Sequence, residues 1–228
     1  MVHCPVVKGL VVAVDGPSGA GKGTVARAAA RALGYRHVDT GAMYRAVAWL
    51  AIDRGTSLES GDAVAAYARD AVFGLHDGRI TIDGHDVTEH IRTPDIDRAA
   101  ALVARNGAVR RVLVDRQRAL GHDGRVVMEG RDIGTVVFPS ADVKIYLDAS
   151  PDERARRRAA DPAHSGGKQG TVAHVAEDLA ARDQSDSTRS VAPLAQAADA
   201  VYIDTTGVPV DEVVARILEL VHETAGHA

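Results

Sequence analysis

The sequence is poor in cysteine and in aromatic residues, with one cysteine, one tryptophan and two phenylalanines among 228 residues. Because Cys4 has no partner in the chain, it cannot form an intramolecular disulfide, which fits a reducing compartment. No apolar run approaches the roughly 20 residues of a membrane-spanning helix, and the first residues lack the apolar segment of a secretion signal. These absences predict a cytoplasmic protein that does not enter membranes.

Strong net charge and metal-binding patterns are absent too. The formal net charge is only −4, so nothing indicates a general nucleic-acid binder. The ten histidines show no metal-ligand spacing, and we expect no structural metal site. Any binding site for an anion must therefore be a local cluster of arginine and lysine.

Short runs rich in Val and Ile alternate with helix-like segments, which is typical of an α/β protein with a wound parallel sheet. Five runs are predicted to form the core strands, at residues 10–15, 36–39, 125–129, 143–148 and 200–204. Helices are predicted at 22–33, 41–53, 94–105 and 108–120, from Ser150, which begins a capping box, and from about Asp211.

One stretch breaks this alternation. After residue 61 the sequence predicts a short helix and then small strands at 72–75 and 79–82, with Asp77-Gly78 and Asp83-Gly84 as hairpin-type turns. We interpret residues 61–106 as an inserted lobe that can cover a substrate. Residues 1–60 and 107–228 are then the core domain.

Residues 16–24 read Gly-Pro-Ser-Gly-Ala-Gly-Lys-Gly-Thr, directly after a predicted strand and at the start of a predicted helix. This is the G-x-x-x-x-G-K pattern of a phosphate-binding loop, whose glycines let successive N–H groups point at a polyphosphate. Lys22 can reach the β- and γ-phosphates, and Thr24 can offer a hydroxyl to Mg²⁺. The predicted donor site for ATP therefore comprises Gly16, Pro17, Ser18, Gly19, Ala20, Gly21, Lys22, Gly23 and Thr24.

Arginines and acidic residues follow other predicted strands, where ligands of open α/β sheets collect. They are Arg45 and Thr40 after the second strand, Arg131 and Asp132 after the third, and Arg182, Asp186 and Arg189 after a later helix. Arginine binds phosphate through paired hydrogen bonds, so this set indicates a second, anionic substrate.

Four further arginines, Arg154, Arg156, Arg157 and Arg158, crowd one short helix before a glycine-rich segment. Like charges at this spacing do not stabilise a helix. We interpret residues 154–170 as an arginine-rich lid that closes on the triphosphate.

Taken together, these segments resemble the bacterial cytidylate kinases, nucleoside monophosphate kinases that transfer the γ-phosphoryl group of ATP to CMP or dCMP. The resemblance rests on residues 15–24, 39–45, 91–93, 129–139, 144–149 and 191–193. It implies a P-loop NTPase-type three-layer fold with a five-stranded parallel sheet of order 2-3-1-4-5. The insert then corresponds to a small α+β lobe that binds the nucleoside monophosphate.

The resemblance also implies residue roles. Cytosine would be read by Thr40, Arg110 and Asp132, the CMP phosphate bound by Arg45, Arg131 and Arg189, and the sugar approached by Arg182 and Asp186. Catalysis would depend on Lys22, Arg131, Asp132 and Arg158, with Arg154 and Arg157 at ATP. Ala101 stands where some relatives carry a sugar-contacting serine, which leaves CMP against dCMP open.

Two alternatives remain at this stage. One is a kinase for another small acceptor, such as an enzyme that accepts UMP and CMP alike or a shikimate-type kinase. The other is a non-catalytic regulator that uses the phosphate loop as a switch and does not need the arginines. In each case we expect a monomer whose partners are small molecules.

Overall fold

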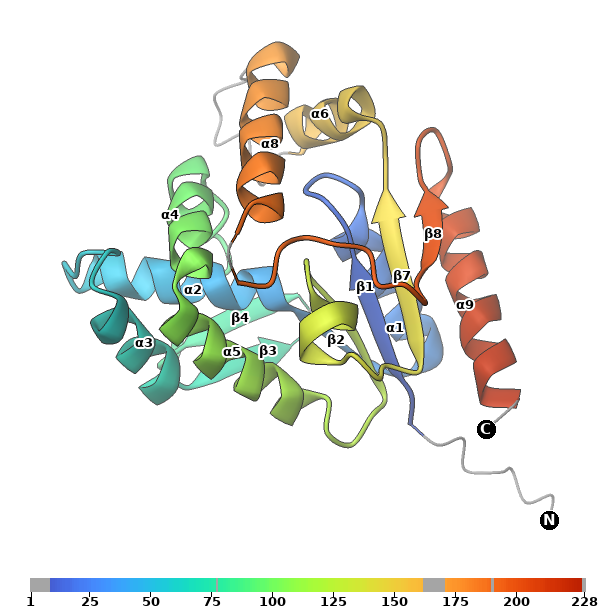
Figure 1. Ribbon diagram of the computed structural model, residues 1–228, viewed down its shortest axis with the longest axis horizontal. Coiled ribbons are helices and arrows are strands. Elements are labelled where there is room, and N and C mark those ends of the chain that lie inside the picture. Colours follow the sequence, from blue (N-terminus) through green and yellow to red (C-terminus); the bar gives the residue numbers. More distant parts are fainter. Residues whose placement is uncertain (1–8, 77, 162–170, 190, 227–228) are drawn as a thin grey trace.

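The computed structural model describes residues 9–76, 78–161, 171–189 and 191–226. Cys4, Asp77 of the predicted hairpin turn and residues 162–170 of the predicted lid lie outside the described residues. Over the described ranges the chain forms a parallel core sheet and a smaller antiparallel sheet, both flanked by helices (Figure 1). None of the described helices has the length and apolar character needed to cross a membrane.

The core sheet contains strands β2, β6, β1, β7 and β8 in that spatial order, and every neighbouring pair is parallel. Their bounds are β1 Val11–Asp15, β2 Arg36–Asp39, β6 Val126–Glu129, β7 Val143–Asp148 and β8 Val201–Asp204. Numbered among themselves, these strands have the order 2-3-1-4-5. The predicted strands and their order are therefore confirmed, with three of them starting one residue later than expected.

Helices cover both faces of this sheet, which gives three layers. On one face α1 (Lys22–Leu33) and α9 (Val210–Gly226) pack on β1 and β7 through buried residues such as Val14, Ile145 and Ile217. On the other face α5 (Gly107–Leu120) and the short π-helix η1 (Ile133–Val137) bury Met128 of β6. The layers hold the carboxyl ends of the strands at one edge, which is the upper edge in Figure 1.

The π-helix η1 was not predicted, because its Val-rich sequence is typical of a strand. Its form depends on Asp15 at the end of β1. The Asp15 carboxylate accepts hydrogen bonds from the N–H groups of Ile133 at 2.8 Å and Gly134 at 2.7 Å. A buried carboxylate thus caps the first turn after β6 and fixes the path of the chain there.

Residues 61–106 form α3 (Gly61–Asp70), β3 (Phe73–His76), β4 (Arg79–Ile82), β5 (His85–Asp86) and α4 (Pro94–Arg105). The strands make an antiparallel sheet, in which β5 was not predicted. The insert does not have a core of its own: Val64 and Ala100 share a hydrophobic cluster with Met43 of α2 (Thr40–Asp53) and Leu113 of α5. The division into residues 1–60 with 107–228 and residues 61–106 therefore stays a prediction.

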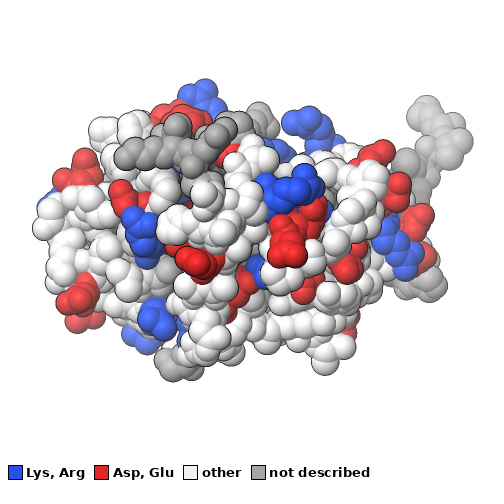
Figure 2. Space-filling model, turned by 90° about the horizontal axis from the view of Figure 1, so that it is seen from above, with Lys and Arg blue, Asp and Glu red and all other residues white. Residues whose placement is uncertain are grey.

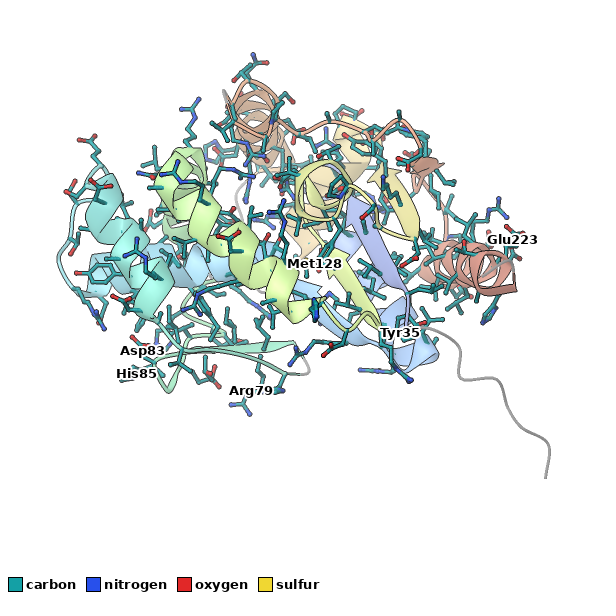
Figure 3. All side chains as sticks on the ribbon, turned by 60° about the horizontal axis from the view of Figure 1, so that its bottom comes forward. Tyr35, Arg79, Asp83, His85, Met128 and Glu223 are labelled. Carbon is teal, nitrogen blue, oxygen red and sulfur yellow. The ribbon has the colours of Figure 1, made fainter. Side chains whose placement is uncertain are left out.

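Two further helices, α6 (Pro151–Ala160) and α8 (Val172–Ser187), lie above the carboxyl ends of the core strands (Figure 1). The predicted start of α6 is confirmed, since the Ser150 hydroxyl accepts a hydrogen bond from the Glu153 N–H at 3.3 Å. From this upper side, basic and acidic side chains are interspersed on the surface, without a large area of one sign (Figure 2). Arg79, Asp83 and His85 lie out on the small sheet, whereas Met128 lies inside, beneath α5 (Figure 3).

Candidate active site

A cleft of about 850 Å³ opens at the carboxyl ends of β1, β2 and β6. Residues from α1, α2, α4, α5, α6 and α8 line it, and they include most of the residues that the sequence singled out. Ser18 to Thr24 form one side, and Thr40, Arg45, Arg110, Arg131, Asp132, Arg182, Asp186 and Arg189 are also among the lining residues. Gly16, Pro17 and Arg154 do not line the cleft.

The phosphate loop runs from Asp15 to the start of α1. Gly16, Gly19 and Gly21 have φ values of 145°, 82° and 87°, which L side chains rarely adopt. A Cβ atom at Gly16 would stand 1.9 Å from the carbonyl oxygen of Leu147, so the loop fits only a glycine there. The loop leads directly into the N-terminus of α1, whose N–H groups favour an anion.

Lys22 is the one lysine of this loop, and it lies buried under the cleft. Its ammonium group donates a hydrogen bond to the Pro17 carbonyl oxygen at 2.6 Å. Burial lowers the pKa of Lys22 to about 7, and the nearby Arg131 acts in the same direction. An anion bound in the loop would favour the charged form of this side chain.

Opposite the loop, the buried residues Arg110 and Asp132 form an ion pair. Burial raises the pKa of the Asp132 carboxyl, and the facing guanidinium group opposes that effect. Thr40 lies nearby and donates its hydroxyl hydrogen bond to the Glu129 carbonyl oxygen at 2.7 Å. The Arg110 guanidinium also lies 5.8 Å from the ring centre of Tyr44.

Asp186 of α8 holds two arginines of the cleft. Its carboxylate accepts a hydrogen bond from Arg131 Nε at 2.8 Å, and its carbonyl oxygen accepts one from Arg189 Nε at 3.3 Å. Burial acts to raise the pKa of the Asp186 carboxyl, but the charge of Arg131 outweighs this effect and holds the pKa below its usual value. Arg45 is held in a similar way by Asp39, at 3.0 Å.

Several arginines of the cleft have N–H groups that no described residue uses as hydrogen-bond donors. Arg45 Nε, Arg182 Nε and Arg189 Nη2 are buried and have no hydrogen-bond partner among the described residues. A buried donor without a partner is costly, and an anion that accepts from it removes that cost. The arrangement therefore fits a phosphate group on the side of the cleft that faces the loop.

The arginines of α6 divide into separate roles. Arg157 donates to the Thr205 hydroxyl at 2.9 Å and carbonyl oxygen at 2.6 Å, and its Nη1 lies next to Gly21 of the loop. Arg156 pairs with Glu153 and is mostly exposed at the rim. Arg158 forms an ion pair with Asp97 of α4.

Arg154, which the sequence assigned to ATP, is instead buried behind the loop. It donates to the carbonyl oxygens of Ser18 at 3.2 Å and Ala149 at 3.1 Å, and it forms an ion pair with Asp183. Its donors are used to support the loop and to join α6 to α8. We therefore find Arg154 outside the cleft, in a position that stabilises the loop from behind.

Sequence reasoning assigned no role to three residues that the structure brings to or near the site. Asp97 and Arg92 lie in the insert; Arg92 belongs to the segment 91–93 that carries the resemblance, whereas no local pattern marks Asp97. Glu129 could have been found, since it ends the strand that pairs with β1. Its carboxylate lies 3.0 Å from His37 Nε2 and within 3.2 Å of where a side chain on Gly23 would begin.

A phosphate loop facing a set of arginines, in one cleft of a three-layer α/β fold, defines a P-loop kinase of a small anionic acceptor. A solved structure of shikimate kinase from Bacteroides thetaiotaomicron has a similar fold, with a TM-score of 0.51, 13% identity, and coverage of 93% of this chain and 98% of that chain.

Comparison with known families narrows this class. The family model described as cytidylate kinase matches residues 12–223, and the chain belongs to the cytidylate kinase family. A cytidylate kinase from Desulfitobacterium hafniense (strain Y51) is 47% identical over 219 residues, which cover 95% of this chain and 94% of that protein. One from Solibacter usitatus (strain Ellin6076) is 48% identical over 223 residues, covering 94% and 93%.

Proposed function

We propose that this protein is an ATP:(d)CMP phosphotransferase, which moves the γ-phosphoryl group of ATP to CMP or dCMP and releases ADP. The observation that carries the proposal is the pairing, in one cleft, of the phosphate loop with buried guanidinium N–H groups that have no partner among the described residues. Two anionic substrates fit such a cleft, one on each side. The names of the relatives above supply the acceptor, a cytidine monophosphate.

We assign the reading of the base to Thr40, Arg110 and Asp132. Cytosine presents an amino donor at N4 and acceptors at N3 and O2, which suit a carboxylate and a guanidinium group. Uracil presents a carbonyl oxygen in place of the amino group, so the Asp132 carboxylate would face another acceptor. A site of this kind discriminates because the wrong base leaves buried polar groups unpaired.

The phosphate of the acceptor is assigned to Arg45, Arg131 and Arg189, two of which have buried donors in reserve. Arg182 and Asp186 are assigned to the sugar side. Ala101 lines the cleft without a hydroxyl, so the choice between ribose and deoxyribose rests on other contacts.

On the donor side, Lys22 and the loop N–H groups are assigned to the β- and γ-phosphates and Arg157 to the triphosphate, while Arg158 is assigned to catalysis. The attacking phosphate oxygen is already anionic, so the residues need only position and neutralise charge. Closure of α6 as a lid over the donor side would exclude water.

Mg²⁺ fits this donor side as a companion of ATP. Among the described residues no group of three or more His, Cys, Asp or Glu could hold a metal ion. The Thr24 hydroxyl is exposed in the cleft, and Mg²⁺ prefers one or two protein oxygens together with phosphate oxygens and water. When bound, the ion would neutralise charge on the phosphates.

We further propose that the protein acts as a monomer in the cytoplasm on small nucleotides alone. The small net charge, and the interspersed charges on the face seen in Figure 2, support the absence of a nucleic-acid partner, since such a partner favours a basic field.

The test is an assay of ADP release with ATP and Mg²⁺ and, in turn, CMP, dCMP, UMP, AMP, shikimate or no acceptor. We expect release that depends on CMP or dCMP and is weak with UMP. Equal rates with UMP and CMP would contradict the assignment of Asp132. Absence of any acceptor-dependent release would favour a nucleotide-binding regulator instead.

A further inference from the structure

One carboxylate on α4, that of Asp97, is the meeting point of side chains from three other helices. Arg182 of α8 brings its Nη1 to 3.3 Å from Asp97 Oδ1, and Arg45 of α2 brings its Nη1 to 4.0 Å from the same oxygen. Arg158 of α6 pairs with the other oxygen, Oδ2. A single acidic residue of the insert thus joins α2, α6 and α8.

The three arginines line the cleft, whereas Asp97 lies behind them with 12% of its side chain exposed. Without a negative charge at this point, three guanidinium groups would repel one another. Burial lowers the pKa of both Arg158 and Arg182, and the charge of Asp97 acts against that shift. The carboxylate therefore offsets the repulsion among the three guanidinium groups and keeps the cluster together.

A guanidinium group is planar and carries five N–H bonds in a fixed arrangement. When one of its arms is held by a carboxylate, the direction of the others is set as well. Arg45 and Arg182 each use Nη1 toward Asp97, while the Nε atom of each is buried without a hydrogen-bond partner among the described residues. In both side chains, therefore, Nη1 faces Asp97 and Nε remains available to a ligand.

We propose that Asp97 is a positioning residue for phosphoryl transfer. It orients Arg45 so that the remaining N–H groups of this side chain meet the phosphate group of the nucleoside monophosphate, and it holds Arg182 on the sugar side and Arg158 at the site of transfer. This inference rests on the proposed function, because the nucleoside monophosphate is the ligand for which the remaining donors are arranged. It also connects the insert to α6 through the ion pair between Asp97 and Arg158.

The first test replaces Asp97 by asparagine, which keeps the shape and removes the charge. The matched control is Asp95→Asn, a change in the same turn of α4, where the carboxylate is 84% exposed and forms an ion pair with Arg98 of its own helix. We expect Asp97→Asn to lower kcat/KM for CMP by about fivefold or more, with KM for ATP unchanged within about twofold. Asp95→Asn should leave both constants unchanged, and an equal effect of the two substitutions would overturn the proposal.

A double-mutant cycle separates positioning from a general structural effect. If Asp97 acts through the arginines, Asp97→Asn should cost less in an Arg182→Met background than in the unmodified protein. An equal cost in both backgrounds would overturn the proposal. Should Asp97→Asn fail to fold, as judged by thermal melting, the same cycle is run with Asp97→Glu, which moves the charge by one methylene group.

The outcomes also separate this inference from the proposed function. If the unmodified protein releases no ADP in response to CMP or dCMP, both are wrong. If it does so and Asp97→Asn retains the full rate, the assignment of Asp97 alone is wrong.

Discussion

The two sides of the cleft are built by different means. The proposed donor side is centred on a continuous segment, residues 18–24, which offers backbone N–H groups and one lysine to a phosphate. The proposed acceptor side is assembled from side chains of α2, α5 and α8 and of the segment after β6, which lie far apart in the sequence. The geometry of the donor side is set by the backbone of one segment, whereas ion pairs between side chains make the acceptor side dependent on the packing of several helices.

This difference has an energetic side as well. In the loop, the positive φ values and the close approach of Gly16 to Leu147 set the direction of the backbone within a few residues. On the acceptor side, Arg131 donates to the carboxylate of Asp186, Arg189 donates to the carbonyl oxygen of Asp186, and Arg45 donates to the carboxylate of Asp39. A substrate phosphate there must share these arginines with the oxygen atoms that already accept from them.

The largest expected effect comes from removing the charge of the donor side. Lys22→Met should lower kcat by about a hundredfold to a thousandfold, as the loss of one fixed charge stabiliser does in other active sites. CMP binding, measured by calorimetry without ATP, should stay within about twofold, because the acceptor arginines are unchanged. Arg31→Met, at an exposed position of the same helix, is the control and should behave like the unmodified protein. If CMP binding is lost with Lys22, the two sides do not act independently.

A smaller effect, confined to the acceptor side, is expected from Asp132→Asn. An amide can donate to the carbonyl oxygen of uracil, so the preference for CMP over UMP, measured as a ratio of kcat/KM values, should fall by about a hundredfold. KM for ATP should not change. The control is Asp115→Asn on α5, whose side chain is 78% exposed. An unchanged ratio would remove Asp132 from the reading of the base.

The contrast between the two sides also explains what could be predicted from the sequence. The core strands and the phosphate loop follow from local patterns, since alternating elements and a Gly-rich turn carry their geometry within a few residues. The order of the strands was expected only through resemblance to a family. Resemblance to a family led us to expect that Arg110 and Asp132 both contact the cytosine base, but not that they pair with each other. Their buried ion pair joins residues 22 positions apart.

What the sequence could not supply depends on distant partners. The π-helix η1 forms where Asp15, 118 residues away, accepts hydrogen bonds from its first N–H groups. Asp97 gains its place only when α2, α6 and α8 converge on it. Arg154 looks like its neighbours in the sequence, but its position on the helix turns it toward Ser18 and Asp183 and away from the cleft.

The smallest expected effect is the uptake of a proton when ATP binds. This uptake distinguishes the lysine of the donor side from the arginines of the acceptor side. With a pKa of about 7, Lys22 is mostly neutral at pH 8 in the free protein and mostly charged at pH 6. ATP favours the charged form, so binding should take up close to one proton at pH 8 and only about a tenth of one at pH 6. Arginines stay charged throughout this range, so CMP binding should show no such uptake by the protein.

Calorimetry of ATP binding, in buffers that differ in ionisation enthalpy, measures this uptake directly. Lys22→Arg is the matched control, because it places a permanently charged group at the same position and removes the titration. The difference between the two proteins at pH 8 isolates the proton taken up by Lys22, since titration of ATP itself is common to both. An identical uptake in both proteins would mean that Lys22 is already charged before ATP binds. In that case burial would not make Lys22 neutral in the free protein. The two sides of the cleft would then differ only in that one binds phosphate through backbone N–H groups and the other through side chains.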